Sequence, residues 1–572
     1  GGGNDGHSGA GPAVCKDRKV TMEETKSHDL PLIVQSDRTM LLDVHSPNAN
    51  SCRDEIMAFS ELVKAPEHIH TYAISAISLW NAKSAGLSTE EILVRLGHWS
   101  KFAVPQTVEN YIQDVSSRFG KLILEPCLEE DYYRLRITDP FIAKAVQANQ
   151  KVSKMLVSTL DDGSNSFRIH RYNRGDAKLA LIKLGYPVDD RIPLVKSEHV
   201  AITMSCKLRD YQENAVRSLL GDLGPGTGYG TIVMPCGSGK TVVGMKIMEA
   251  LQTRTLILCP NVVAVHQWIN EIKSKTNLSD DMVGEYSGEK KEIRPITVCT
   301  YQVLTYRASK DGDFEHMKVI EAGNWGLVIY DEVHMLPAPV FKITAELQSV
   351  YRAGLTATLI REDGKEDDVF SLVGPKRFDI PWTDLSQKGW IASAYCVEVR
   401  VPLKEDLALP YAIANRREKY KLASTNDAKN SVVDSLLEKH KGESIIIIGQ
   451  YLDQLKDLQK RLGFPMITGS TSNSKRDELY SRFKEGLDKV IIVSKVANFA
   501  IDLPDASVAI QISGTFGSRQ EEAQRLGRIL RPKRNPCFFY SLVSKYTVEE
   551  EFSANRQKFL VEQGYHYVVE EV

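Results

Sequence analysis

Several features that would assign a chain of this size to a particular class are missing. The nine cysteines are scattered singly with no CxxC pair, so a structural zinc or an iron–sulfur cluster has no support and reduced thiols are expected. No apolar run approaches the ~20 residues that a membrane-spanning helix needs. No cationic stretch followed by an apolar core opens the chain. The sequence therefore predicts a protein of a reducing compartment, with no membrane segment and no secretory signal.

An excess of charge of one sign is also missing. The net charge is −2, which does not indicate nucleic-acid binding, although a narrow basic groove can coexist with an acidic exterior. A hydrophobic share of 42% and a charged share of 26% are ordinary for a soluble globular protein. The length suggests roughly three or four domains. Residues 1–30 are rich in glycine and polar groups and are expected to form a disordered tail.

A glycine-rich turn between a strand-like and a helix-like segment predicts a phosphate-binding loop. Residues 230–234 read as a buried strand, and a helical pattern begins at Thr241. The glycines let backbone N–H groups turn inward, Lys240 can reach the β- and γ-phosphates, and the Thr241 hydroxyl can ligate Mg²⁺. Met234 stands where the usual pattern has its first glycine. The residues predicted to bind the nucleotide here are Pro235, Cys236, Gly237, Ser238, Gly239, Lys240 and Thr241.

Two carboxylates, Asp331 and Glu332, end an apolar run over 325–330 that is typical of a central parallel strand. The carboxyl ends of such strands face the crevice in which α/β sheets bind ligands. We predict that Asp331 holds Mg²⁺ through its water shell and that Glu332 polarises the attacking water. By itself the pair would be read as a solvated loop. Its place behind a buried strand, downstream of Lys240, favours the second half of the same site.

Arginines at every third position predict a third part of the site. Arg525, Arg528 and Arg531 would share one face of a helix, and Gln524 stands beside them. A solvated surface helix is the ordinary alternative. If the helix closes over a triphosphate from a second domain, Arg528 and Arg531 would stabilise the transferring phosphoryl group, which can contribute ~10³–10⁵ in rate.

Two residues upstream of the phosphate loop predict a base-binding role. Arg209 and Gln212 can offer the donor and the acceptor that an adenine edge needs.

Apolar runs alternate with helix-like segments in two halves of the chain, which predicts two βα domains with the nucleotide in the cleft between them. The runs are residues 255–258, 296–298, 325–330 and 353–358 in one half and 445–448, 490–493 and 508–512 in the other.

The region before residue 204 carries no catalytic signature. Residues 31–35 and 40–44 resemble the strands of a hairpin, and Ser88 to Glu91 forms a capping box. A helical stripe runs from Val108 to Phe119. Further on stands a basic cluster that is either a solvated face or a DNA contact: Arg168, His170, Arg171 and Arg174.

The three nucleotide motifs together resemble those of a superfamily 2 helicase, and within that group an XPB-type DNA helicase of the bacterial kind. The resemblance spans about residues 31–568 and includes two more specific marks, Arg361 to Asp363 directly after residues 355–360 and the segment 514–520 before the arginines. It implies an α/β fold class, with two RecA-like parallel-sheet motor domains, an N-terminal α+β region and a helical thumb insertion.

The resemblance also implies a division of the chain. After the tail, residues 31–204 would form a DNA-engaging region, with a helical or winged-like part to about 150 and a small α/β, damage-recognition-like part after it. Residues 205–388 would be the first motor domain, which binds ATP. Residues 389–572 would be the second, with the thumb at about 402–430.

The implied function is ATP-driven 3′→5′ movement on DNA and strand separation at damaged or forked DNA in repair. The implied cofactors are ATP and Mg²⁺, and the implied partner is DNA at junctions of single strand and duplex. A repair nuclease or a transcription partner is left open. A monomer in the cytoplasm, associated with the nucleoid in a bacterium, is expected.

The family resemblance assigns DNA-side roles as well. The triplet matching Arg361, Glu362 and Asp363 would assist strand separation, and the stretch matching Thr300, Tyr301 and Gln302 would contact strand phosphates. In the expected thumb, Arg416 and Arg417 stand near Tyr420, an interleaving that suits phosphate neutralisation with base stacking or, equally, a solvated helix face.

Two other functions remain open. A duplex translocase would use the same motor without steady unwinding. A damage-binding scaffold with a vestigial motor would be expected to have lost some of the nucleotide residues, and all of them are present.

Overall fold

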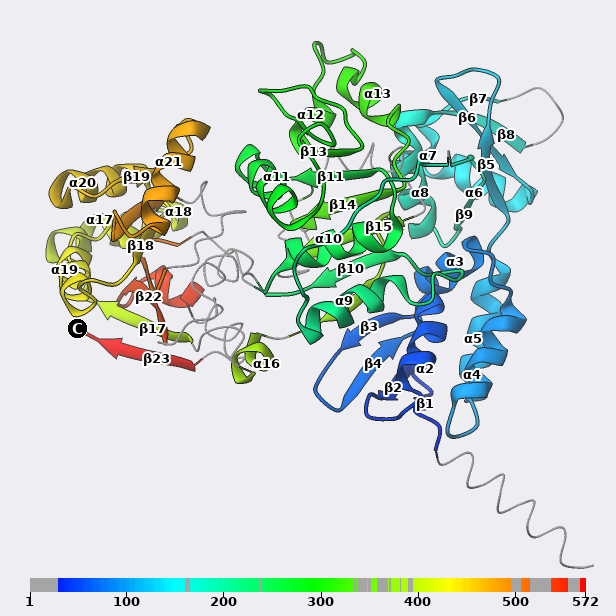
Figure 1. Ribbon diagram of the computed structural model, residues 1–572, viewed down its shortest axis with the longest axis horizontal. Coiled ribbons are helices and arrows are strands. Elements are labelled where there is room, and N and C mark those ends of the chain that lie inside the picture. Colours follow the sequence, from blue (N-terminus) through cyan, green and yellow to red (C-terminus); the bar gives the residue numbers. More distant parts are fainter. Residues whose placement is uncertain are drawn as a thin grey trace, which may run out of the picture.

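The chain forms four β-sheets that follow one another along the sequence (Figure 1). The computed structural model describes residues 29–159, 165–194, 196–235, 238–333, 336, 347, 351–356, 369, 372–380, 382–388, 394–494, 506–514, 536–553 and 566–572. Within these residues no helix is both long enough and apolar enough to cross a bilayer.

The first sheet is a four-stranded antiparallel sheet in the order β1-β2-β4-β3. The predicted hairpin is confirmed, because Leu32 pairs with Leu42. The capping box is confirmed too: the Ser88 hydroxyl accepts from the Glu91 N–H at 3.1 Å, and the Glu91 carboxylate accepts from the Ser88 N–H at 3.0 Å. The elements are β1 (Leu32–Val34), β2 (Thr39–Asp43), β3 (Glu61–Lys64), β4 (Ile69–Ala73), α2 (Ala49–Ile56), η1 (Met57–Phe59), α3 (Ala76–Ser84), α4 (Thr89–Trp99) and α5 (Gln106–Ser117).

The second sheet has five strands in the order β7-β8-β6-β5-β9, antiparallel except for the β5–β9 pair. Its strands are β5 (Leu122–Pro126), β6 (Tyr132–Ile137), β7 (Leu156–Thr159), β8 (Asn165–His170) and β9 (Val188–Asp190), with helices α6 (Pro140–Ala148), α7 (Gln150–Ser153), η2 (Arg171–Asn173) and α8 (Arg174–Lys183). Because β6 pairs with β8, residues on both sides of 150 belong to one sheet. The expected division at about 150 therefore falls inside this unit rather than between two units.

The third sheet, with its helices, is lobe 1 (residues 210–387). Seven parallel strands run in the order β12-β13-β11-β14-β15-β10-β16. They are β10 (Tyr229–Val233), β11 (Thr255–Cys259), β12 (Val283–Tyr286), β13 (Ile296–Thr300), β14 (Leu327–Asp331), β15 (Tyr351–Thr356) and β16 (Lys376–Asp379). The helices are α9 (Asp210–Leu220), α10 (Lys240–Leu251), α11 (Val262–Lys275), α12 (Tyr301–Thr305), α13 (Glu315–Glu321) and α16 (Trp382–Gln387).

Both faces of the lobe 1 sheet are buried, which explains why its strands are apolar throughout. On one face Ile257 and Ile329 pack with residues of α9, α10 and α11. On the other face Leu258 and Val328 pack with residues of α12 and α13.

The fourth sheet, with its helices, is lobe 2 (residues 394–571). Seven parallel strands run in the order β19-β20-β18-β21-β22-β17-β23. They are β17 (Ala394–Val401), β18 (Ile445–Gly449), β19 (Met466–Ile467), β20 (Val490–Ser494), β21 (Val508–Gln511), β22 (Cys537–Ser544) and β23 (His566–Glu571). The helices are η5 (Glu405–Leu407), α17 (Ala408–Ile413), α18 (Arg416–Ser424), α19 (Lys429–Lys439), α20 (Leu452–Leu462) and α21 (Asn473–Lys484).

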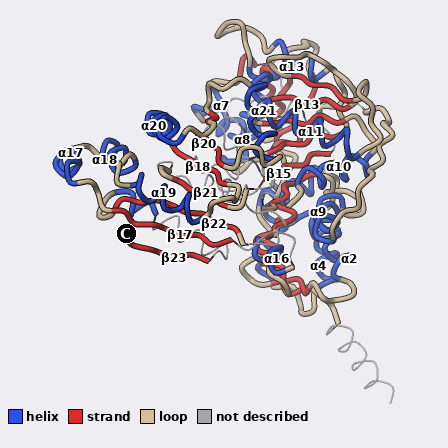
Figure 2. The backbone as a smooth tube through the Cα atoms, turned by 60° about the vertical axis from the view of Figure 1, so that its left-hand side comes forward, coloured by secondary structure: helices blue, strands red, loops and turns tan. Residues whose placement is uncertain are grey.

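Two parallel sheets of this kind confirm the predicted fold class, a pair of RecA-like domains. The short helices α17 and α18 follow β17 and stand at the edge of lobe 2 (Figure 2), inside the range expected for the thumb. The boundaries at 204/205 and 388/389 lie between sheets and stay predictions.

A buried arginine joins the unit built on the first sheet (residues 32–117), here called the first domain, to lobe 1. Arg377 of β16 is 4% exposed, and its guanidinium donates to four backbone carbonyls. Two of these, Met57 and Ser60, lie in the first domain, and the other two, Gly226 and Tyr229, lie beside β10. Since planar guanidinium presents five donors in fixed directions, one side chain can satisfy carbonyls of two units at once.

Replacing Arg377 by methionine removes these donors and leaves buried carbonyls unpaired, which should lower the free energy of unfolding by ~3 kcal/mol. A urea titration of Arg377→Met, with limited proteolysis of the first domain, measures the effect. Arg118→Met is the matched control, because the exposed Arg118–Asp114 pair contributes only ~0.5 kcal/mol or less. An equal shift in the two variants would contradict the role of Arg377.

Candidate active site at the carboxyl edge of lobe 1

The loop between β10 and α10 is held from behind by α9. The Tyr211 hydroxyl donates to the Ser238 carbonyl at 2.6 Å, and the Gln212 amide donates to the same oxygen at 2.9 Å. Gly239 has φ +89°, and a Cβ there would lie 2.3 Å from the Gln212 amide nitrogen. Only glycine fits this position without strain, because both the backbone angle and the space exclude a side chain.

Lys240 begins α10, and its ammonium lies 2.9 Å from the Glu332 carboxylate. Both side chains are nearly buried, at 11% and 6% exposed. Glu332 follows β14 with φ +49°, a left-handed conformation that is uncommon outside glycine. The fold therefore brings together Lys240, Asp331 and Glu332, as the sequence predicted.

Asp331 ends β14, and two other elements hold it. The Trp268 indole N–H donates to its carboxylate at 3.0 Å, and the Tyr301 hydroxyl donates to its backbone carbonyl at 2.7 Å. Burial raises the pKa of Asp331 to about 7, the adjacent Glu332 charge adds to this rise, and the Lys240 ammonium partly offsets it.

This donor set fits a hard divalent cation. Two buried carboxylates, Asp331 and Glu332, follow one another at the end of β14. Carboxylate and hydroxyl oxygens are the ligands that Mg²⁺ prefers. Thr241, in the first turn of α10, supplies the hydroxyl. Asp331 and Thr241 are the residues that would hold the ion.

The predicted base-binding pair lies at the start of α9. Gln212 is 5% exposed, and both ends of its amide are engaged, with the Arg209 N–H at 2.9 Å and with the Ser238 carbonyl. The half-buried Arg209 guanidinium lies 3.4 Å from the Tyr211 hydroxyl. Gln212 thus supports the phosphate loop in this structure, and adenine recognition by either residue stays a prediction.

The three residues predicted to contact DNA phosphates differ in their exposure to solvent. Gln302 is exposed at the start of α12, whereas Thr300 and Tyr301 are 5% and 1% exposed. The Tyr301 side chain points into the core towards Asp331. A contact between residues 300–302 and a DNA strand would therefore use the Gln302 side chain or the backbone, because the Tyr301 ring is buried.

In the expected thumb, too, some of the predicted side chains are exposed and one is buried. Arg416 and Arg417 are exposed on α18, with Arg416 3.3 Å from Glu551. Tyr420 is 2% exposed, and its hydroxyl donates to the Gly514 carbonyl at 2.8 Å. The expectation that Tyr420 stacks on bases is wrong for this structure, because helical spacing turns it towards the core of lobe 2.

The basic cluster of the second sheet is neutralised by acidic partners. Arg168 pairs with Glu129, Arg171 pairs with Glu321 of lobe 1, and Arg174 lies 2.7 Å from Asp190. These ion pairs weigh against the DNA contact, and the solvated face is wrong for Arg174, which is 4% exposed.

Other predicted residues fall outside the part of the chain that the structure describes. They are Cys236 and Gly237 of the loop, the triplet Arg361, Glu362 and Asp363, and the second-lobe residues Gln524, Arg525, Arg528 and Arg531.

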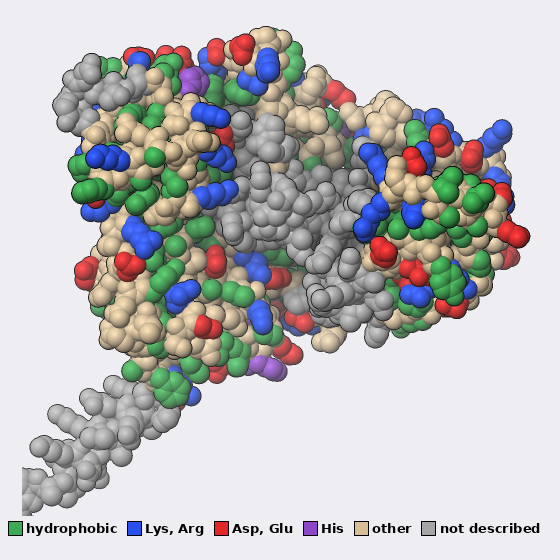
Figure 3. Space-filling model, turned by 180° about the vertical axis from the view of Figure 1, so that it is seen from behind, with side chains coloured by type: hydrophobic (Ala, Val, Ile, Leu, Met, Phe, Trp, Pro, Cys, Tyr) green, Lys and Arg blue, Asp and Glu red, His purple; other side chains and the backbone are tan. Residues whose placement is uncertain are grey.

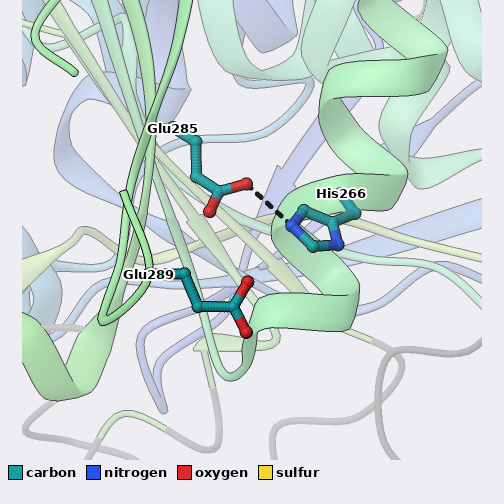
Figure 4. A group of neighbouring side chains, drawn as sticks. All are labelled: His266, Glu285 and Glu289. Carbon is teal, nitrogen blue, oxygen red and sulfur yellow. Dashed lines mark ion pairs between the residues drawn. The ribbon is translucent and has the colours of Figure 1, made fainter. Parts of the chain in front are cut away.

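A separate polar cluster lies on the other side of α11, where lobe 1 meets lobe 2. His266 Nε2 lies 2.7 Å from Glu285 (Figure 4). The Nδ1 atom of His266 lies 3.3 Å from Asp477 of α21. Glu289 accepts from the Asn473 amide of α21 at 2.7 Å. These side chains form a polar contact between the lobes that sequence reasoning did not predict.

Sequence reasoning also missed Trp268 and Tyr211. The spacing of Val265, Trp268 and Ile272 marks the buried face of α11. A buried indole N–H needs an acceptor, so this pattern implied a polar partner without saying which.

The geometry defines a class of protein: two RecA-like lobes, with a phosphate loop and paired carboxylates at the carboxyl edge of the lobe 1 sheet, form the motor of an ATP-dependent helicase. Models of three families match the chain, namely "ERCC3/RAD25/XPB C-terminal helicase" at 385–571, "Type III restriction enzyme, res subunit" at 205–361 and "Helicase conserved C-terminal domain" at 32–161. The chain belongs to the XPB family of ATP-dependent DNA helicases.

Full-length relatives support this placement. "DNA 3'-5' helicase XPB" of Mycobacterium tuberculosis is 47% identical over 548 residues, covering 95% of this chain and 98% of its own. The protein of the same name from Kineococcus radiotolerans is 46% identical, covering 94% and 96%. "General transcription and DNA repair factor IIH helicase/translocase subunit XPB" of Enterocytozoon bieneusi is 34% identical, covering 95% and 92%.

Gly239→Ala should reduce ATP hydrolysis by about 100-fold, since the added methyl group and the positive φ displace the loop and a misplaced phosphate costs about that much. Steady-state ATPase with the Km for ATP measures it. Gly97→Ala is the control, because Gly97 lies inside α4 with open space around it and alanine there favours the helix. Wild-type turnover in Gly239→Ala would show that the loop does not bind phosphate.

Proposed function

We propose that the protein is a 3′→5′ DNA helicase that separates strands at damaged or forked DNA during repair, using ATP with Mg²⁺. The observation that carries the proposal is the buried group of Lys240, Asp331 and Glu332 at the carboxyl edge of lobe 1. The names of the bacterial relatives support the direction, and the name of the relative from Enterocytozoon bieneusi supports the link to repair.

The chain's own groups suit each step of phosphoryl transfer. On nucleotide binding, Lys240 would exchange the Glu332 carboxylate for phosphate oxygens, which frees Glu332 to orient the attacking water. Mg²⁺, when bound, neutralises charge on the phosphates. Arg528 and Arg531 would approach from lobe 2 and stabilise charge in the transition state.

Exposed cations on both lobes suit a polynucleotide backbone. Seen from behind, lysine and arginine side chains occur on the parts of both lobes that border the middle of the view (Figure 3). Arg416 and Arg417 are exposed on lobe 2, and Gln302 is exposed on lobe 1. Contacts of this kind neutralise phosphates without reading sequence, as a motor that moves along DNA requires.

A duplex translocase is the second candidate. The relative from Enterocytozoon bieneusi carries "helicase/translocase" in its name, and the two lobes would serve either activity. That relative is also a subunit of a transcription and repair factor, so a protein partner from a repair assembly is compatible with this chain. We further propose that the protein acts as a monomer and in the cytoplasm.

A forked-duplex assay tests direction and activity together. The protein should displace the strand from a substrate with a 3′ tail and leave a 5′-tailed substrate intact. Lys240→Ala should abolish ATP hydrolysis and displacement while DNA binding stays within about twofold, since the buried ammonium would bind the phosphates of the nucleotide rather than those of DNA.

The outcomes separate the candidates. Displacement from the 5′-tailed substrate alone would contradict the proposed direction. Removal of a third strand from a triplex, without displacement of any tailed strand, would establish the translocase instead.

Arg361→Ala should lower unwinding by about tenfold and DNA-stimulated ATPase by less than twofold, because a strand-separating side chain acts on the duplex rather than on the nucleotide. Parallel unwinding and ATPase rates measure the split. Arg461→Ala, which removes an exposed cation paired with Asp434 on lobe 2, is the control. Equal losses in both rates would contradict a separating role for Arg361.

A further inference from the structure

Two buried aromatic side chains reach the same carboxylate residue from two different elements. Trp268 of α11 and Tyr301 of α12 are each 1% exposed. The indole N–H of Trp268 donates to the Asp331 side chain, and the hydroxyl of Tyr301 donates to the Asp331 backbone. Asp331 therefore has both its side chain and its backbone fixed by groups that take no part in phosphoryl transfer.

Tyr301 connects Asp331 to the surface stretch that faces the polynucleotide in the proposed function. It follows β13 directly, and its neighbour Gln302 is exposed. In the sheet β11 lies between β13 and β14, so the Tyr301 ring spans the end of β11 to reach Asp331. A displacement of residues 300–302 by a bound strand would be transmitted through this hydroxyl to the end of β14.

Trp268 connects Asp331 to the helix that follows the phosphate loop. A Cβ at Gly244 of α10 would lie 2.6 Å from the edge of the Trp268 ring, so the ring packs directly against that helix. The same ring donates to Asp331 at 3.0 Å. One rigid side chain thus sets the distance between the phosphate-loop helix and the predicted Mg²⁺ ligand.

We propose that Tyr301 and Trp268 are positioning residues: Tyr301 couples binding of a polynucleotide to hydrolysis, and Trp268 fixes Asp331 for its metal ion. The inference rests on the proposed function, which assigns the polynucleotide to the side of Gln302 and Mg²⁺ to Asp331. Both side chains are buried and bonded to Asp331, so their effect on the site passes through that residue.

Lobe 1 contains matched aromatic side chains that make the same kind of bond elsewhere. The Tyr286 hydroxyl is 2.8 Å from His316 Nδ1, and the Trp325 indole N–H donates to the Ile320 carbonyl at 2.7 Å. Both side chains are buried, at 3% and 6% exposed. Tyr286→Phe and Trp325→Phe therefore each lose a hydrogen bond made by a buried aromatic side chain to a group other than Asp331.

The experiment compares four full-length variants, Tyr301→Phe, Trp268→Phe, Tyr286→Phe and Trp325→Phe. ATPase is measured without DNA and with a saturating forked duplex, each across a Mg²⁺ titration, and thermal unfolding is recorded for every variant. Tyr301→Phe should lower the ratio of DNA-stimulated to basal ATPase by about fivefold or more, the usual lower range of a coupling between two sites. Its basal rate is recorded in the same titration, because the ratio separates the coupling from any loss common to both conditions.

Trp268→Phe should raise the Mg²⁺ concentration for half-maximal ATPase by about tenfold, as loss of a hydrogen bond to a metal ligand does. This shift should be the same with and without DNA. The two control variants should keep the wild-type ratio and the wild-type Mg²⁺ dependence, with thermal midpoints lowered as much as those of the test variants.

An unchanged stimulation ratio in Tyr301→Phe, or an equal fall in Tyr286→Phe, overturns the role of Tyr301. An unchanged Mg²⁺ dependence in Trp268→Phe overturns that of Trp268. If the wild-type protein itself hydrolyses ATP without responding to DNA, the proposed function fails, and the coupling fails with it. A stimulated wild type with an equally stimulated Tyr301→Phe contradicts the coupling alone.

Discussion

Two carboxylates buried at the end of one strand, with the Lys240 ammonium against one of them, form the constraint on which the candidate nucleotide site depends. Burying Asp331 and Glu332 together is costly, because a like charge and lost hydration both oppose ionisation. Lys240 offsets one negative charge at 2.9 Å, and the Trp268 indole stabilises the other carboxylate. Such a group of buried charges suits the metal ion and the phosphates of the proposed function.

The helix α11 relates this constraint to the second lobe. His266 and Trp268 are two positions apart, about 200° around the helix, so they face opposite sides. His266 contacts Asp477 of α21 at 3.3 Å, whereas Trp268 contacts Asp331. A change in how α21 meets lobe 1 therefore acts on the helix that also positions Asp331. The contact between the lobes and the carboxylate site share one rigid element.

Much of the motor fold was predictable because its central strands are buried on both faces and read as continuous apolar runs, as Leu327 to Tyr330 do. The Ser88 cap was predictable from local chemistry alone. Edge strands such as β16, with the sequence Lys-Arg-Phe-Asp, lack this pattern, and β9 joins its sheet by pairing with the distant β5. Their pairing is decided by tertiary contacts that no short stretch records.

At the candidate site the sequence predicted which residues meet but not what each side chain does. Lys240, Asp331 and Glu332 lie together because strand ends and a glycine turn place them there. Tyr301 and Tyr420 were expected to face DNA, yet both rings are buried with their hydroxyls bonded to carbonyls. A tyrosine is amphipathic, so residue type and spacing alone do not distinguish a core anchor with a bonded hydroxyl from an exposed stacking platform.

The Arg377 guanidinium fixes the first domain relative to lobe 1. Two of the four carbonyls that accept from it lie in the first domain, and the other two lie beside β10, the strand that leads into the phosphate loop. One guanidinium therefore joins the first domain and the strand before the phosphate loop into a single unit, and removing it would release both sides of the junction at once.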